Sequence, residues 1–168
     1  MRKGKGMTKA KGGCLCGRHR YAVTAEPIRT TICHCRFCQR ATGVAYMVQP
    51  VFAAADFAML TGPAQTYTHL SEGSGKEVYV HFCAACGTKL YLTFQRFPGF
   101  VGLYRGTFDN PNWFAVTPET SKHIFLGQAQ QGTVIPAGVN CFMEHAAQSD
   151  GTAIAPTVFD SARTIRGN

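Results

Sequence analysis

Seven of the eight cysteines in this 168-residue chain lie in short motifs whose spacing suits a metal ion. Cys83-Ala84-Ala85-Cys86 is a Cys-x-x-Cys motif followed by Gly87, which is the pattern of a zinc knuckle. A tight turn in such a motif brings both sulfurs to one metal, and the glycine takes the positive-φ position that closes the turn. Backbone amides of the turn can then stabilise the thiolate charge.

A second motif, Cys14-Leu15-Cys16, lies far upstream. In an extended segment, two cysteines separated by one residue point to the same face, because side chains alternate along a strand. Structural zinc takes four ligands in a tetrahedron, and its apparent binding free energy is roughly 10–16 kcal/mol. We therefore predict one closed structural zinc site. Its ligands would be Cys14, Cys16, Cys83 and Cys86, and the alternative is a pair of unrelated thiol motifs.

The remaining clustered cysteines, Cys33, Cys35 and Cys38, offer three thiolates with no obvious fourth ligand. Catalytic zinc sites are built in this way, with three protein ligands and an open position for water or substrate. An open zinc–thiolate site favours a soft, anionic fourth ligand such as an incoming thiol, whose pKa the zinc would lower. We predict a second zinc here, at the position where any chemistry takes place.

The neighbours of this cluster allow several interpretations. Arg36 and Arg40 could bind the carboxylates of a small acidic ligand, or they could simply be solvated. His34 could complete a closed site, although in a strand its side chain would point away from those of its neighbours. The three cysteines could also be redox thiols without a metal. Cys141 stands alone beside Phe142, and we predict that it is a small buried hydrophobic residue.

Composition and charge describe a globular chain of the size of one domain. Hydrophobic residues make up 45% and charged residues 15% of the sequence, and the formal net charge is +8. Without residues 1–11 there remain 17 − 5 = 12 basic and 9 acidic residues, a net charge of +3, which disfavours nucleic acid as a partner. We predict a basic disordered tail over residues 1–11 and a single zinc-binding domain over residues 12–168.

The expected location is the cytoplasm. No stretch approaches the ~20 apolar residues of a membrane span, and the N-terminus lacks the apolar core of a secretory signal. In a reducing compartment, clustered cysteines are more often metal ligands than disulfides.

The segments that must position these motifs are predominantly strands, so the predicted fold class is all-β. Period-two alternation between Gly- and Pro-containing turns predicts strands over residues 18–24, 30–34, 44–52, 65–70, 77–82, 89–94, 100–104 and 123–126. Short helices are expected at residues 36–41 and 53–58. Beyond Gly127 we expect loops.

The cysteine motifs, taken in order, resemble those of the glutathione-dependent formaldehyde-activating enzyme family, which is grouped with the centromere protein V proteins. The resemblance covers roughly residues 12–126. The residues that carry it are Gly12 to Gly17, Arg20-Tyr21, Cys33 to Arg40 with Gly43, Phe82 to Thr88, Gly106 to Pro111, Pro118 and His123 to Phe125.

The resemblance implies an Mss4-like fold of several coiled antiparallel β-sheets with zinc-bound hairpins, and the same division of the cysteines into a structural and a functional site. It also implies a zinc-dependent carbon–sulfur lyase that joins the thiol of glutathione to formaldehyde as S-hydroxymethylglutathione. Two further hypotheses are a non-catalytic module that binds glutathione, another thiol or zinc, and a zinc module that binds nucleic acid.

Overall fold

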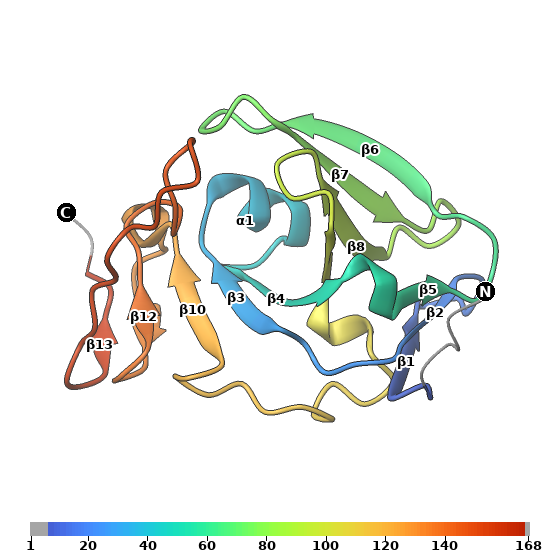
Figure 1. The fold of residues 1–168 in the computed structure, drawn as a ribbon, viewed down its shortest axis with the longest axis horizontal. Helices are drawn as coiled ribbons and strands as arrows, with labels where there is room; N and C mark the ends of the chain where they lie inside the picture. The colour runs from blue at the N-terminus through green and yellow to red at the C-terminus, as the bar shows by residue number, and fades with distance from the viewer. Residues whose placement is uncertain (1–6, 167–168) are drawn as a thin grey trace. The chain divides into compact units, whose positions relative to one another are not determined.

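Short strands joined by tight turns account for most of the chain in the computed structural model, which describes residues 7–166 (Figure 1). The chain divides into two compact units. The first contains the residues up to Ile28 together with Pro50–Phe114, and the second contains Arg29–Gln49 and the residues from Ala115 onward. One boundary between the two units, that between Gln49 and Pro50, falls within strand β4 (Met47–Ala53). The all-β prediction is confirmed, whereas the single domain over residues 12–168 stays a prediction.

One sheet of the first unit is antiparallel, with the strand order β1-β2-β5. These strands are β1 (Ala10–Gly13), β2 (Arg20–Val23) and β5 (Phe57–Met59). Of the predicted basic tail, residues 1–6 lie outside the described residues, but Ala10 and Lys11 belong to β1. The backbone N–H of Lys9 already donates to the carbonyl of Val23 at 2.9 Å. Backbone hydrogen bonds hold this segment in the sheet. Such bonds do not depend on side-chain type, so the sequence shows no hydrophobic pattern that would have predicted the strand.

A second antiparallel sheet of the first unit contains the hairpins that lead to Cys83. Its strands run in the order β9-β8-β7-β6, and the end of β4 pairs with β9 through Phe52 and Val101. They are β6 (Gln65–Leu70), β7 (Glu77–Phe82), β8 (Lys89–Phe94) and β9 (Phe100–Leu103). The predictions for β6, β7 and β8 have the observed bounds. A register shift between His81 and Phe82 bends β7 just before Cys83.

The predicted helix at residues 53–58 is wrong. This segment forms the 3₁₀ turn η1 (Ala54–Asp56) and then strand β5. A run this short cannot stabilise an α-helix by itself. Thr24 fixes the turn instead, since its N–H donates to the carbonyl of Asp56 at 3.0 Å and its hydroxyl donates to the Asp56 carboxylate at 3.2 Å.

The second unit contains parallel strands, which differs from the antiparallel sheets that the family resemblance implied. Strand β10 (Ser121–Ile124) pairs in parallel with both β3 (Arg29–Cys33) and β12 (Asn140–Cys141). Parallel pairing requires a long connection between the strands, and the chain between β3 and β10 provides one. Strands β11 (Val134–Ile135) and β13 (Arg163–Thr164) pair antiparallel.

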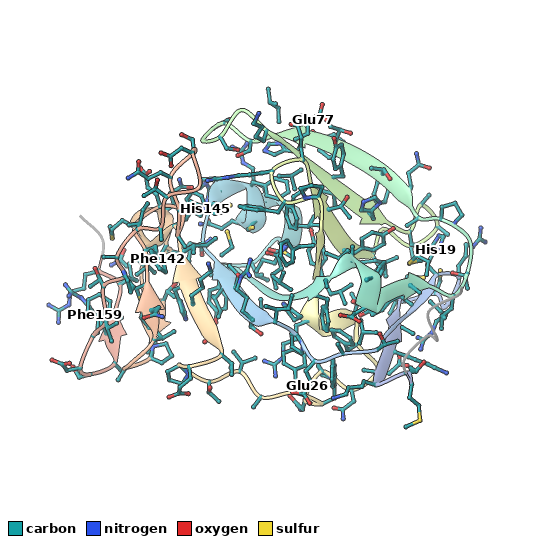
Figure 2. All side chains as sticks on the ribbon, in the orientation of Figure 1. His19, Glu26, Glu77, Phe142, His145 and Phe159 are labelled. Atoms are coloured by element: carbon teal, nitrogen blue, oxygen red, sulfur yellow. The ribbon has the colours of Figure 1, made fainter. Side chains whose placement is uncertain are left out.

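A small hydrophobic core lies in the C-terminal part of the second unit. Leu126, Ile135, Val139 and Cys141 are buried together, and Phe159 packs against them. Figure 2 labels Phe159 in this part of the chain. The predicted burial of Cys141 is confirmed, since 1% of this residue is exposed. The short strands β11 to β13 were not predicted, because two-residue strands have no periodicity to detect.

The one α-helix among the described residues is α1 (Arg36–Thr42), close to the predicted bounds, and it ends at Gly43 with φ of 75°. Two 3₁₀ turns, η2 (Arg105–Thr107) and η3 (Leu126–Gln128), complete the elements. Within residues 7–166, no helix has the length and apolarity that a membrane crossing requires.

A substitution at Gly12 tests the packing of β1 just before the motif Cys14-Leu15-Cys16. A Cβ atom at this position of β1 would overlap the hydroxyl of Tyr21 and the carbonyl oxygen of Thr107. We expect Gly12→Ala to lower the free energy of unfolding by about 1–3 kcal/mol, because a rigid neighbour cannot move aside. Denaturant unfolding would measure this change. The matched control is Gly62→Ala, which meets no atom within 4 Å and should stay within about 0.5 kcal/mol of the wild type. Equal stability of the two variants would contradict the packing argument.

Candidate metal centres

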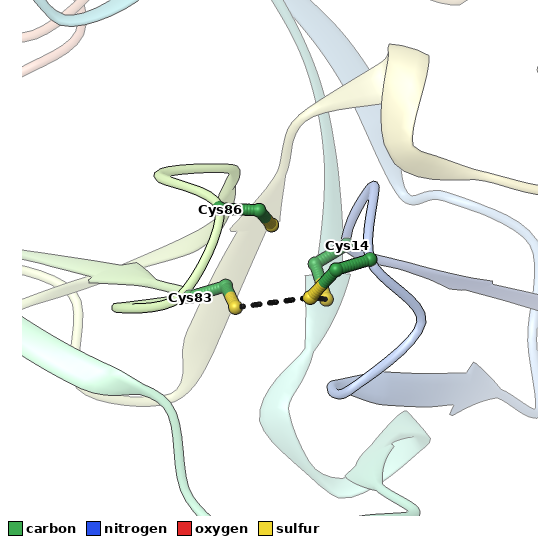
Figure 3. A group of neighbouring side chains, drawn as sticks. Cys14, Cys83 and Cys86 are labelled. Atoms are coloured by element: carbon green, nitrogen blue, oxygen red, sulfur yellow. Dashed lines mark hydrogen bonds between the residues drawn. The ribbon is translucent and has the colours of Figure 1, made fainter.

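The first cysteine cluster brings together two segments that are far apart in the sequence. Cys14 and Cys16 follow β1, and Cys83 and Cys86 follow β7. The Sγ atoms of Cys14 and Cys16 are 3.6 Å apart, and those of Cys16 and Cys83 are 3.7 Å apart. All four sulfurs lie within 4.8 Å of one another. Figure 3 shows the thiols of Cys83 and Cys86 on one segment facing Cys14 on the other.

Tight turns bring the sulfurs of each motif close together. Gly87 has φ of 72°, as predicted, and its N–H donates to the carbonyl of Cys83 at 2.8 Å. The motif Cys14-Leu15-Cys16 also forms a turn, which corrects the prediction of an extended segment. Gly17 allows this turn with φ of 75°, and its N–H donates to the carbonyl of Cys14 at 3.0 Å.

Local hydrogen bonds stabilise negative charge on two of these thiols, those of Cys14 and Cys86, and lower their pKa values. The N–H of His19 points at the Cys14 Sγ at a distance of 3.2 Å. The Thr88 hydroxyl lies 3.2 Å from the Cys86 Sγ, and the hydrogen bonds from Thr88 lower the pKa of Cys86 to about 5. The same hydroxyl accepts the N–H of Leu15 at 3.1 Å, so Thr88 also links the two segments.

The donor set and spacing of this cluster fit a zinc ion. Zinc–thiolate bonds of about 2.3 Å in a tetrahedron place neighbouring sulfurs about 3.8 Å apart. The observed separations of 3.6 and 3.7 Å are close to that value. All four cysteines are free thiols, so each is available as a ligand.

The second cluster is local in sequence. Cys33 ends β3, Cys35 is the N-cap residue of α1, and Cys38 lies within the helix. The Sγ atoms of Cys33 and Cys35 are 3.4 Å apart, and all three sulfurs lie within 4.8 Å of one another. Three free thiols with this spacing also fit a metal, and they leave one tetrahedral position for another ligand.

Within this cluster, Cys35 is the thiol that ionises most readily. Hydrogen bonds from the thiols of Cys33 and Cys38 lower the pKa of Cys35 well below its ordinary value, and the backbone N–H of Cys38 adds a contact at 3.4 Å. The same interaction with Cys35 raises the pKa of Cys33. Cys33 and Cys38 are buried, whereas Cys35 is partly exposed. The cluster is therefore most accessible from the side of Cys35.

His34 does not join this cluster. Among the described residues, the group of potential ligands contains only the three cysteines. The His34 ring is fully buried, and its Nε2 lies 3.0 Å from the Nδ1 of His123 with the two rings stacked. Burial lowers the pKa of both histidines to about 4, so both are neutral at neutral pH.

The sequence analysis missed this histidine pair. His123 lies in β10 beside β3, and their parallel register, with His123 opposite Ile32, brings the two rings together. Only this pairing could have revealed the contact, because 89 residues separate the two histidines.

The two candidate ligand-binding arginines lie on the helix that carries Cys38. The N–H of Arg36 donates to the Gln128 Oε1 at 2.8 Å, and its guanidinium donates to the Gln39 side-chain oxygen. Arg40 is exposed in the last turn of α1. A role in ligand binding stays a prediction for both.

Comparison with known proteins gives one family match. The family model described as glutathione-dependent formaldehyde-activating enzyme matches residues 9–128, a range that contains all seven clustered cysteines. Among solved structures, a protein of Rhodobacter sphaeroides aligns with a TM-score of 0.49 and 21% sequence identity. The alignment covers 63% of this chain and 96% of that protein. No curated protein gives a significant match.

Cys83→Ser tests whether the four-cysteine cluster supports the fold through a metal. Loss of one ligand removes much of a binding free energy of roughly 10–16 kcal/mol, so we expect insoluble or unfolded protein with less bound zinc. Solubility, circular dichroism and zinc content of the purified protein would measure this. The control is Cys141→Ala, at a cysteine outside both clusters, which should keep its zinc. A well-folded, zinc-replete Cys83→Ser variant would rule out the structural role.

Proposed function

The chain belongs to the glutathione-dependent formaldehyde-activating enzyme family, and we propose on this premise that it is a zinc-dependent carbon–sulfur lyase. Its substrate would be the adduct of a thiol and an aldehyde, with glutathione and formaldehyde giving S-hydroxymethylglutathione. The observation that carries this proposal is the cluster of Cys33, Cys35 and Cys38, which would supply three thiolates to a zinc ion and leave one tetrahedral position for a further ligand.

In this proposal the two clusters have different roles. Cys14, Cys16, Cys83 and Cys86 would hold a structural zinc ion with all four positions filled. Cys33, Cys35 and Cys38 would hold the second zinc. When bound, that zinc would lower the pKa of an incoming thiol, so that the thiol is present as thiolate at neutral pH.

The reaction itself needs one new bond and one proton transfer. The sulfur lone pair attacks the aldehyde carbon to form the carbon–sulfur bond, and the carbonyl π electrons move to the oxygen. That oxygen takes up a proton, which balances the proton lost by the thiol. The reverse reaction breaks the same carbon–sulfur bond. The partly exposed side of Cys35 provides the approach for the thiol.

The charges of α1 fit a ligand that carries carboxylates. Arg36 and Arg40 are both exposed on the helix that carries Cys38. A guanidinium group binds a carboxylate with two parallel hydrogen bonds, and glutathione has two carboxylates. Arg36 is already held by Gln39 and Gln128, so Arg40 is the more adaptable of the two. We place the protein in the cytoplasm, where glutathione keeps thiols reduced.

Cys35→Ser tests the proposed site directly. Native mass spectrometry should detect two zinc ions per wild-type chain and a complex with glutathione. We expect the variant to lose one zinc and its glutathione binding, because Cys35 is the thiol with the lowest pKa of the three-thiolate cluster. Cys141→Ala should behave like the wild type. An unchanged zinc count and unchanged thiol binding in Cys35→Ser would exclude this assignment.

Kinetics separate catalysis from binding alone. The adduct of glutathione and formaldehyde also forms without a catalyst, so its formation rate must be compared with and without the protein. A rate above background that disappears in Cys35→Ser would support the lyase. Binding of glutathione with no rate enhancement would favour the non-catalytic thiol-binding module.

Arg40→Gln tests recognition of a ligand carboxylate. Exposed ion pairs contribute little, so we expect the dissociation constant for glutathione to rise only about two- to fivefold. The constant for a small thiol without carboxylates should not change, since that ligand has no group for Arg40 to bind. Titration calorimetry with both thiols would measure the two constants. An equal effect on both thiols would speak against carboxylate recognition.

A further inference from the structure

The side-chain amide of Gln39 uses all of its hydrogen-bonding capacity. Its Nε2 donates to the carbonyl of His34 at 2.6 Å and to the carbonyl of Gln128 at 2.8 Å. Its Oε1 accepts from the Nε2 of Gln130 at 3.0 Å and from the guanidinium of Arg36. Only 4% of Gln39 is exposed. A buried amide with two donors and two acceptors all satisfied is held in a single orientation.

One of the two carbonyls that Gln39 binds is that of His34, the residue between Cys33 and Cys35 in the sequence. The peptide bond from His34 to Cys35 contains this carbonyl, and the orientation of that peptide sets the direction of the Cys35 side chain. His34 is also fixed by its N–H, which donates to Ile124 at 3.1 Å, and by its ring contact with His123. With the hydrogen bond from Gln39, the carbonyl, the N–H and the ring of His34 all have a partner, so the residue between Cys33 and Cys35 is held in place.

The second carbonyl bound by Gln39 belongs to η3, and a strained residue positions this turn. Phe125 precedes η3 with φ of 60° and ψ of 41°, a left-handed conformation that is unusual for a bulky side chain. This conformation turns the chain after β10 and brings Gln128 to the start of α1. There the Gln128 side chain accepts the N–H of Arg36.

Helix α1 needs such contacts because it is short. It has seven residues and no acidic side chain in its first turn. Isolated helices shorter than ~12–15 residues are marginal in water, so contacts outside the helix must set the position of Cys38. Gln39 follows Cys38 directly, and its amide links the helix to both neighbouring segments.

We propose that Gln39 is a positioning residue of the three-thiolate site, which keeps Cys35 and Cys38 at the spacing that zinc and an incoming thiol require. Gln39 acts through the peptide bond of His34 and through α1, and it does not contact the reacting groups. This inference rests on the proposed function, because it assigns Gln39 to the same zinc site. Groups that orient metal ligands typically change metal affinity by about 10–100-fold when they are removed.

The test compares two substitutions with a matched control. Gln39→Met keeps the approximate size but removes the amide, and Gln39→Glu replaces the donor group with an acceptor that faces two carbonyl oxygens. The control is Gln49→Met, at another buried glutamine of the same unit, whose Nε2 has no hydrogen-bond partner within the described residues. The measurements are zinc competition with a chromophoric chelator and the absorption spectrum after cobalt substitution.

We expect the second zinc to bind about 10–100-fold more weakly in both Gln39 variants, with an altered cobalt spectrum, while the first zinc is retained. Gln49→Met should match the wild type. If both Gln39 variants are folded and show wild-type affinity and an unchanged cobalt spectrum, the inference is wrong and the proposed function remains. A wild-type protein with one zinc would overturn the proposed function and the inference together.

Gln130→Ala keeps the inference testable if the Gln39 variants do not fold. Gln130 is exposed, and its substitution removes one of the four hydrogen bonds to Gln39. The loss of one such bond should weaken the second zinc about two- to tenfold. Wild-type affinity and spectrum in this variant would then count against the inference.

Discussion

Close approach of thiol sulfurs is the constraint on which this structure depends. Thiolates a few ångströms apart repel one another strongly unless a cation lies between them. Both clusters nevertheless hold their sulfurs within 4.8 Å of one another, and the shortest separations, 3.4 to 3.7 Å, are close to the value of about 3.8 Å for a tetrahedral zinc site. The turn at Gly87, the bend of β7 and the capping of α1 by Cys35 each serve this spacing. The turns and strands around both clusters thus bring the thiols to distances at which they could hold a metal ion.

The two clusters meet this constraint in different ways. The four-cysteine cluster joins segments that are far apart in the sequence, and Thr88 adds a hydrogen bond to each segment. The three-cysteine cluster occupies one strand end and the start of one short helix. Its cysteines are local in sequence, but its geometry depends on distant residues, because β10 supplies the contacts to His34 and the segment after β10 supplies those to Gln39. The proposed zinc site needs this support, since within residues 7–166 no fourth potential ligand joins the three thiols.

The sequence predicted the features that depend on local spacing. The cysteine motifs indicated both clusters, the positive φ of Gly87 followed from the knuckle pattern, and period-two alternation located β6, β7 and β8. Contacts that depend on the pairing of distant strands were not predicted. The stacking of His34 on His123 follows from the parallel register of β3 and β10, which no local pattern reveals. The roles of Gln128 and Gln130 were likewise hidden in a segment that read as loops.

Each cluster lies wholly within one compact unit, and this separation has a consequence for how the protein responds to its surroundings. A four-thiolate site is expected to hold zinc more tightly than a three-thiolate site with one exchangeable position, so the two proposed sites would fill at different free zinc concentrations. Under the proposed function, the chain within that interval would be folded but would lack its second zinc. The free zinc concentration would then set the fraction of molecules that can react, while the number of folded molecules stays constant.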